Sequence, residues 1–370
     1  MKFLNKKIIG IGLLGVFLFA GGIIYFSEKL NNVDKVQNEK KSFREDVLSS
    51  PTPSDVEIQI PERFIIPMRH HTFQTFNNCG PATLSMALSY WDVNISQHEL
   101  GNILRPYQVA KGDNDDKSVT LEEVARQAEV YGLHAYLRPN GTLEKIEKFI
   151  SQEIPVVTRT RLEPHEDIGH YRIIRGYDRN AHEIIQDDSL QGKDLRYSYG
   201  EFITLWQPFN YEYLLIVPEE KKEIVEKILG EELSERAAWE NALSRIEAEI
   251  QENSDNWHLI FAKSRVHYYL EEYEKSIEEF EKVEDRISFR TLWYQIEPIK
   301  SYYELRRYEK VFQITDAILN NQNRAFSELY YIRGQMYLDQ GDTALARGEF
   351  ENAVRYKNNY TPAIEMLKNL

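Results

Sequence analysis

The sequence predicts an α+β domain followed by an all-α domain, with one apolar helix in front of both. Between residues 62 and 218, segments with helical periodicity come mainly first, and segments rich in β-branched and aromatic residues come mainly later. From residue 219 onward the periodicity is helical almost throughout. Near the N-terminus, residues 8–26 carry no charge. A chain of 370 residues is too long for one ordinary core, so several domains are expected.

Residues 8–26 are predicted to form a transmembrane signal-anchor. A helix of this length spans about 28 Å, close to the thickness of the hydrocarbon core of a bilayer. Three lysines in residues 1–7 favour a cytoplasmic N-terminus. The polar residues 27–61 then form a linker, and the chain is expected at the cell membrane, single-pass, with its later domains extracytoplasmic. A cleaved signal peptide is the alternative.

Capping boxes and strand patterns define the expected elements of residues 62–218. Helices are predicted to begin after Ser96, Thr120 and Ser198, because each is followed by a glutamate three positions later. Four segments are predicted as strands because they are β-branched or aromatic and bounded by turn residues. They are 155–161, 170–178, 182–186 and 211–217. The order of elements favours an antiparallel sheet packed on the helix that follows Cys79.

Three similar units follow one another in residues 219–370. They begin at Tyr268, Tyr303 and Tyr337, so their offsets are 35 and 34 residues. The last unit combines small residues with aromatic ones, which allows two helices to approach closely. The segment from about residue 234 to the end resembles the tetratricopeptide repeat, whose period is about 34 residues. The resemblance implies a concave face that holds a protein or peptide partner. An ordinary helical bundle is the alternative.

Composition excludes several other functions. The net charge is −14, and an acidic chain repels phosphate backbones, so no nucleic-acid partner is expected. The acidic loop 112–118 has a lysine where a calcium loop needs an oxygen ligand, so no metal is expected. No cofactor motif is present, and none is expected. One cysteine excludes an internal disulfide framework.

Cys79, the only cysteine, lies in the stretch QTFNNCGPATLSMALSYW. Asn-Asn before it and Gly-Pro after it mark the beginning of a helix, and one side of that helix is expected to be buried. The partial positive charge at a helix N-terminus favours thiolate over thiol. A structural cysteine would more often lie inside an apolar stripe.

A thiolate nucleophile needs a base, and the base needs an orienting group. Of the nine histidines, His170 is best placed, because it opens a predicted strand beside a glycine. His182 is the fallback. His70 and His71 are expected on the surface, His98 in a capping box, and His258 and His267 packed in the repeats. The following strand ends in Asp187 and Asp188, either of which could orient the base. Gln74, five residues before Cys79, could donate to an oxyanion.

These residues occur together in one known family. Seven features carry the resemblance: Gln74, Cys79-Gly-Pro-Ala, Gly169-His170-Tyr171, Gly176-Tyr177-Asp178, Asp188, Glu201-Phe202 and Trp206. With them the chain resembles papain-like cysteine peptidase family thirty-nine, the bacteriocin-processing-peptidase-like group, in its stand-alone form. The resemblance implies a papain-like fold over about residues 64–218. It also implies Cys79 as nucleophile, His170 as general base, Asp188 as orienter and Gln74 as oxyanion donor. Family members commonly have Asp-Pro where this chain has Asp188-Ser189, so Asp187 stays an alternative orienter.

Three functional hypotheses follow. The first is a membrane-anchored, extracytoplasmic cysteine peptidase that hydrolyses peptide bonds, with peptide or protein substrates and repeats that bind protein. The second is another acyl transfer at the same thiol, such as transpeptidation. The third is a catalytically silent papain-like module that acts as an adaptor through its repeats.

Overall fold

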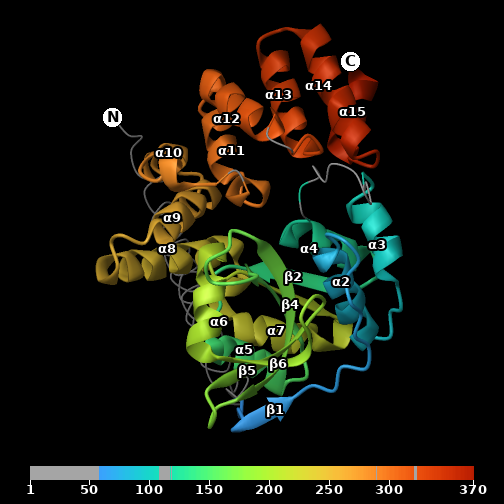
Figure 1. The fold of residues 1–370 in the computed structure, drawn as a ribbon, viewed down its shortest axis with the longest axis vertical. Helices are drawn as coiled ribbons and strands as arrows, with labels where there is room; N and C mark the ends of the chain where they lie inside the picture. Colours follow the sequence, from blue (N-terminus) through green and yellow to red (C-terminus); the bar gives the residue numbers. More distant parts are fainter. Residues whose placement is uncertain (1–57, 108–116, 118, 289, 321–322) are drawn as a thin grey trace, which may run out of the picture. The chain divides into compact units, whose positions relative to one another are not determined.

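A seven-stranded antiparallel sheet forms the centre of the region 62–218, called here the α+β region (Figure 1). The computed structural model describes residues 58–107, 117, 119–288, 290–320 and 323–370. The strand order is β2-β7-β3-β4-β5-β6, and β1 pairs with β4. The strands are β1 Arg63–Ile65, β2 His134–Arg138, β3 Val156–Arg161, β4 Gly169–Asp178, β5 Glu183–Asp188, β6 Gly192–Ser198 and β7 Tyr213–Val217. The predicted α+β class with an antiparallel sheet is confirmed.

Helices cover both faces of this sheet. Successive side chains of a strand point to opposite faces, and β7 shows this directly. Leu214 and Ile216 pack with the helices of one face, whereas Leu215 and Val217 pack with those of the other. The first group is α2 Cys79–Tyr90, α3 Gln97–Leu104 and α4 Leu121–Val130. The second group is α5 Leu143–Ser151, α6 Tyr199–Trp206 and α7 Lys222–Leu229. Strands β3, β4, β5 and β7 therefore have two buried faces.

Helix α2 is buried more completely than its sequence pattern indicates. Ten of its twelve residues are buried, because the sheet lies on one side and α3 and α4 pack against the other. The expectation of a helix buried along one side only is therefore wrong. The three predicted capping boxes are all formed, at Ser96, Thr120 and Ser198, and each fixes the first residue of its helix.

Helical hairpins make up the C-terminal part, residues 219–370, called here the repeat region. The helices of successive hairpins are α9 Trp257–Tyr269 with α10 Tyr273–Glu281, α11 Glu297–Glu304 with α12 Tyr308–Asn320, and α13 Ser327–Asp339 with α14 Thr343–Tyr356. They are flanked by α8 Glu235–Glu252 and α15 Thr361–Asn369. A Cβ added at Gly334 would lie 2.5 Å from Cε1 of Phe350, so the close packing of α13 on α14 requires a glycine there. This helical region fits the predicted tetratricopeptide repeats.

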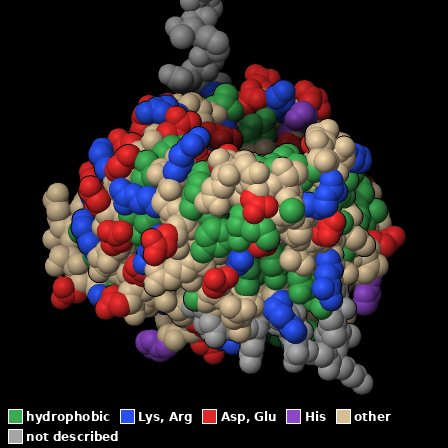
Figure 2. Space-filling view, turned by 90° about the horizontal axis from the view of Figure 1, so that it is seen from above, with side chains coloured by type: hydrophobic (Ala, Val, Ile, Leu, Met, Phe, Trp, Pro, Cys, Tyr) green, Lys and Arg blue, Asp and Glu red, His purple; other side chains and the backbone are tan. Residues whose placement is uncertain are grey.

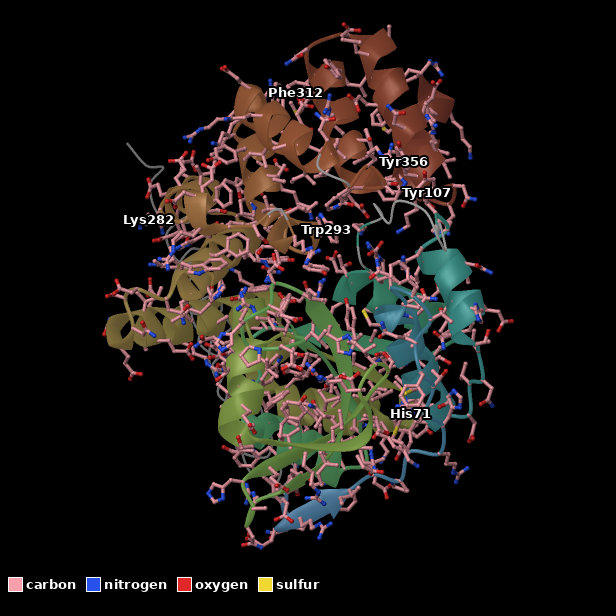
Figure 3. All side chains as sticks on the ribbon, in the orientation of Figure 1. His71, Tyr107, Lys282, Trp293, Phe312 and Tyr356 are labelled. Atoms are coloured by element: carbon pink, nitrogen blue, oxygen red, sulfur yellow. The ribbon has the colours of Figure 1, made fainter. Side chains whose placement is uncertain are left out.

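Ionic contacts join the repeat region to the α+β region within the compact unit Gln59–Leu370. Arg265 on α9 pairs with Glu212, which precedes β7, at 2.9 Å. Lys357, which follows α14, pairs with Glu123 on α4. Tyr107 and Tyr356, labelled in Figure 3, add an edge-to-face contact with ring centroids 5.1 Å apart. On the face shown in Figure 2, acidic and basic side chains are interspersed, so the net negative charge is not gathered there.

The predicted localisation needs a correction. In the part of the chain that the structure describes, no helix is long and apolar enough to cross a membrane, since a span needs about 20 largely apolar residues. The predicted span at residues 8–26, with the flanking segments 1–7 and 27–57, lies outside the described residues. The structure therefore does not support the prediction of a single-pass membrane protein with extracytoplasmic domains.

Candidate functional site

Cys79 is the first residue of α2 and is only 7 % exposed. The side chain of Asn78, which precedes it, makes no capping hydrogen bond to the helix, so no side-chain oxygen offsets the positive charge at the helix end where Cys79 lies. Burial acts most strongly on the thiol and raises its pKa. A hydrogen bond to His170 and the charges of His170, Arg159 and Arg105 outweigh burial, so the pKa of Cys79 is lowered overall.

The ring of His170 lies between Cys79 and Asp188. Its Nε2 is 2.8 Å from Oδ1 of Asp188, and the residue is 2 % exposed. Because Nε2 contacts the carboxylate, the other ring nitrogen, Nδ1, is the one available to the Cys79 thiol. Burial lowers the pKa of His170, but the hydrogen bonds to Asp188 and Cys79 and their charges raise it to about 9. The imidazole is therefore held in its protonated form beside the thiol.

Both carboxylate oxygens of Asp188 interact with neighbouring groups. Its Oδ1 also accepts the backbone N–H groups of Leu190 at 2.6 Å and Gln191 at 2.9 Å. Its Oδ2 forms an ion pair with Nε of Arg172, 3.0 Å away. Burial raises the pKa of Asp188, but the hydrogen bond and charge of His170, the Gln191 N–H and Arg172 lower it overall. A carboxylate held so firmly keeps its charge and its orientation toward the imidazole.

Asp187, the alternative orienter, points away from this set. Its Oδ1 is 3.0 Å from Nε of Arg175 and accepts the backbone N–H of Asp194 at 2.9 Å. Neighbouring residues on a strand face opposite ways, so only one of the two aspartates can meet His170. The structure places Asp188 there.

Gln74 lies on the loop that leads into α2. Its backbone N–H donates to the carbonyl of Ser189 at 2.7 Å, and the Ser189 hydroxyl donates to its Oε1 at 2.9 Å. The oxygen of the amide is therefore held by Ser189, and the amide nitrogen is the end that can donate to a ligand. Ser189, the residue after Asp188, thus connects Gln74 to Asp188.

Two side chains that the sequence analysis missed hold this loop. The buried Gln97 accepts the N–H of Thr75 at 2.8 Å and donates to the carbonyl of Phe73 at 2.7 Å. The buried Arg105 donates to the carbonyl of Asn77 at 2.6 Å and to Oδ1 of Asn78 at 2.9 Å. Neither follows a motif, and only the rarity of buried polar side chains could have drawn attention to them.

Of two other histidines, His71 contacts the backbone of Asp188, whereas His182 lies in an exposed turn. His71, labelled in Figure 3, is half-buried, and its Nε2 contacts the backbone carbonyl of Asp188 at 2.9 Å, although a surface position was expected. His182, the fallback base, is exposed in a turn with a φ of 57°. His170 is therefore the histidine that the fold brings beside Cys79.

The comparison with family models gives a match over the α+β region. Residues 64–214 match the Peptidase_C39 like family. The predicted family resemblance is confirmed over these residues, which include Gln74, Cys79, His170 and Asp188. Similarity to this family supports a cysteine peptidase type of function. Among curated proteins, none matches the chain by sequence.

Solved structures similar to this chain fall into two groups. A C39-like peptidase from Bacillus anthracis is 16 % identical with a TM-score of 0.35, covering 42 % of this chain and 98 % of that one. The peptidase domain of Streptococcus ComA, described as a bifunctional ABC transporter involved in quorum sensing, is 17 % identical with a TM-score of 0.32, covering 40 % and 97 %. A tetratricopeptide-repeat protein from Thermus thermophilus is 16 % identical with a TM-score of 0.30, covering 38 % and 79 %.

Proposed function

We propose that residues 62–218 are a cysteine peptidase domain that hydrolyses peptide bonds, and that residues 219–370 are a repeat domain that binds the peptide or protein substrate. Cys79 is the nucleophile, His170 the general acid and base, Asp188 the orienting group and Gln74 the oxyanion donor. The observation that carries this proposal is the continuous contact from Cys79 through His170 to Asp188, with a histidine pKa of about 9.

The reaction proceeds in two halves. The Cys79 thiolate attacks the substrate carbonyl carbon, and the oxyanion accepts hydrogen bonds from the Gln74 amide and the Cys79 backbone N–H. His170 donates its Nδ1 proton to the leaving amine, which departs and leaves a thioester on Cys79. His170 then removes a proton from water, whose oxygen attacks the thioester carbonyl carbon; the C–S bond breaks, the acid product leaves and the Cys79 thiolate is restored beside the protonated His170. Asp188 holds the ring in place throughout and stabilises its protonated state.

Alkylation of the one thiol by iodoacetamide, across pH 4 to 9, tests the site without a known substrate. The lowered pKa of Cys79 and the raised pKa of His170 favour a thiolate–imidazolium pair. Labelling of the full chain is therefore expected to be fast well below the free-thiol pKa of about 8.5. His170→Ala should abolish this fast labelling, whereas His182→Ala, at the exposed turn, should preserve it. If labelling of the native chain rises only near that free-thiol pKa, Cys79 is not activated and the adaptor hypothesis gains support.

The proposed binding role of the repeat domain rests on a large cavity. It has a volume of about 880 Å³ and is lined by side chains of both regions. Its walls are rich in aromatic residues, among them Trp239, Tyr268 and Tyr303 of the repeat domain. Aromatic walls bind peptide side chains over a large area, with little loss of conformational entropy. Pull-down with Trp239→Ala and Tyr303→Ala variants, compared with the inactive Cys79→Ala chain, would test this role.

A further inference from the structure

Arg159 on β3 is a buried cation whose hydrogen-bonding groups are incompletely used. The residue is 3 % exposed, and its Nε and Nη2 have no hydrogen-bond partner among the residues that the structure describes. Two acidic groups interact with its charge: the Cys79 thiol, whose pKa it lowers, and Glu212, which is itself bound to Arg265 at 2.9 Å. Neither accepts a hydrogen bond from Nε or Nη2, and leaving buried guanidinium N–H groups without acceptors is costly, so this arrangement calls for a reason other than packing.

Aromatic rings surround the Arg159 guanidinium and hold it in one position. Its Cζ lies 4.0 Å from the ring centroid of Tyr294, 5.1 Å from that of Phe209 and 5.4 Å from that of Tyr171. Such contacts stabilise the cation through the ring faces but leave the N–H groups at the guanidinium edge without acceptors. Tyr294 comes from the repeat domain, so both domains build this site.

The guanidinium lies near the proposed nucleophile, because its charge lowers the pKa of Cys79. In the β3–β4 register, Arg159 is opposite Tyr171 and so lies on the face of the sheet where Tyr171 packs in one cluster with Cys79. A Cβ added to Gly169, the residue before His170, would lie 3.2 Å from Nε of Arg159. Arg159 also lines the cavity of about 880 Å³, so a ligand in that cavity can reach it.

A planar guanidinium with open N–H groups matches a carboxylate, which accepts two parallel hydrogen bonds from it. We propose that Arg159 is a specificity-determining residue that binds a carboxylate of the substrate next to the scissile bond, with Tyr294 forming the adjoining wall. The inference deepens the proposed peptidase function and rests on it. The carboxylate belongs either to an acidic side chain or to the C-terminus of a short peptide.

Two alkylating probes of matched shape test the proposal on the full chain. N-iodoacetylglycine carries a carboxylate one residue from its reactive carbon, and N-iodoacetylglycinamide carries an amide there. The ratio of their labelling rates at Cys79, divided by the same ratio for free cysteine, measures anion recognition. We expect this normalised ratio to be roughly tenfold or more in the native chain, as for a charge-assisted hydrogen bond. Arg159→Gln should bring it to about one.

Arg161→Gln is the matched control, because Arg161 lies two positions along the same strand and contacts His258 instead, at 3.1 Å. It should keep the native ratio. A ratio of one in the native chain, or an equal loss in both variants, overturns the carboxylate site while leaving Cys79 activation intact. Slow labelling by both probes, no faster than in the unfolded chain, overturns the peptidase function itself and this inference with it.

A measurement on the native chain covers the case in which Arg159→Gln fails to fold. N-acetylglycine should protect Cys79 from iodoacetamide at a lower concentration than N-acetylglycinamide does, and equal protection overturns the proposal. Two peptide ligands then identify the source of the carboxylate. Preferential protection by a peptide with an acidic side chain and an amidated C-terminus indicates side-chain recognition, whereas preference for a neutral peptide with a free C-terminus indicates a terminal carboxylate.

Discussion

Replacing Asp188 by asparagine removes one negative charge from the site but keeps its shape. The asparagine Oδ1 can still accept the N–H groups of Leu190 and Gln191 and a hydrogen bond from Nε2 of His170, as the aspartate does now. What disappears is the charge that favours the imidazolium. The substitution also breaks the ion pair between Oδ2 and Arg172, and the uncompensated positive charge of Arg172 acts on the pKa of His170 in the same direction.

The size of the effect follows from the contact itself. A hydrogen bond between charged partners contributes about 1.5–3 kcal/mol. Because one pKa unit corresponds to about 1.4 kcal/mol, the loss of charge should lower the pKa of His170 by roughly one to two units. The native pKa is about 9, so the variant value should fall to about 7 to 8.

Nitrogen NMR of the chain labelled at histidine measures this directly, with the His170→Ala spectrum providing the assignment. Asp187→Asn is the matched control, since Asp187 is the next residue and binds Arg175 at 3.0 Å. It should leave the His170 titration unchanged. The reasoning is refuted if Asp188→Asn leaves that titration at its native value, or if Asp187→Asn lowers it equally.

Three further predictions concern packing and charge. Gly169→Ala should slow iodoacetamide labelling of Cys79, because its Cβ would lie 3.2–3.3 Å from Arg159, Phe209 and Tyr294; unchanged labelling would contradict this. Gly334→Ala should destabilise the chain by about 1–3 kcal/mol in urea unfolding through its clash with Phe350, whereas Gly348→Ala, with open space around it, should be neutral or slightly stabilising. Glu123→Gln should cost about 1.5–3 kcal/mol at neutral pH, because the buried Lys117 would lose a carboxylate 2.9 Å away while it keeps Glu328 at 2.8 Å. The exposed Glu122→Gln should have little effect.

The Glu123 prediction has a defined pH dependence. Burial raises the pKa of Glu123, but Lys117 and Lys357 lower it far below its usual range. A carboxyl with a depressed folded-state pKa stabilises the fold above its unfolded-state pKa, and this contribution is lost as the pH falls. The native chain and Glu123→Gln should therefore approach the same stability in acid. A difference that stays constant down to pH 3 would contradict the assignment.

Local sequence signals predicted much of the fold because they act over a few residues. A capping box fixes a helix start within one turn, and Ser96, Thr120 and Ser198 all gave the right residue. Long buried strands such as β4 have a clear composition. Strands β1, β2 and β6 were missed because their composition is less clear: β1 has only three residues, β2 has five that are mostly half-buried, and β6 carries mostly exposed side chains. Their pairing is decided by the neighbouring strands.

Of the candidate site, too, only a part could be predicted from the sequence. Cys79, His170 and Asp188 could be proposed from order and spacing, but the choice between Asp188 and Asp187 depends on which strand face meets the histidine. Arg159 and Arg172 are charged residues inside buried strands, which is a visible anomaly in the sequence. Their partners, however, come from distant segments, so the role of each could not be derived from its neighbours along the chain.

The cavity lined by both regions restricts how the repeats could bind a partner. The concave face of a repeat array is usually open to a partner, and the sequence suggested this use. Here the walls of the cavity come from both regions, with ionic contacts between Arg265 and Glu212 and between Lys357 and Glu123. A peptide bound there would touch the repeats and Arg159 together, because both line the same space. Binding to the repeats and access to the peptidase site are therefore expected to be coupled, and a ligand of the repeat wall should change the labelling rate of Cys79.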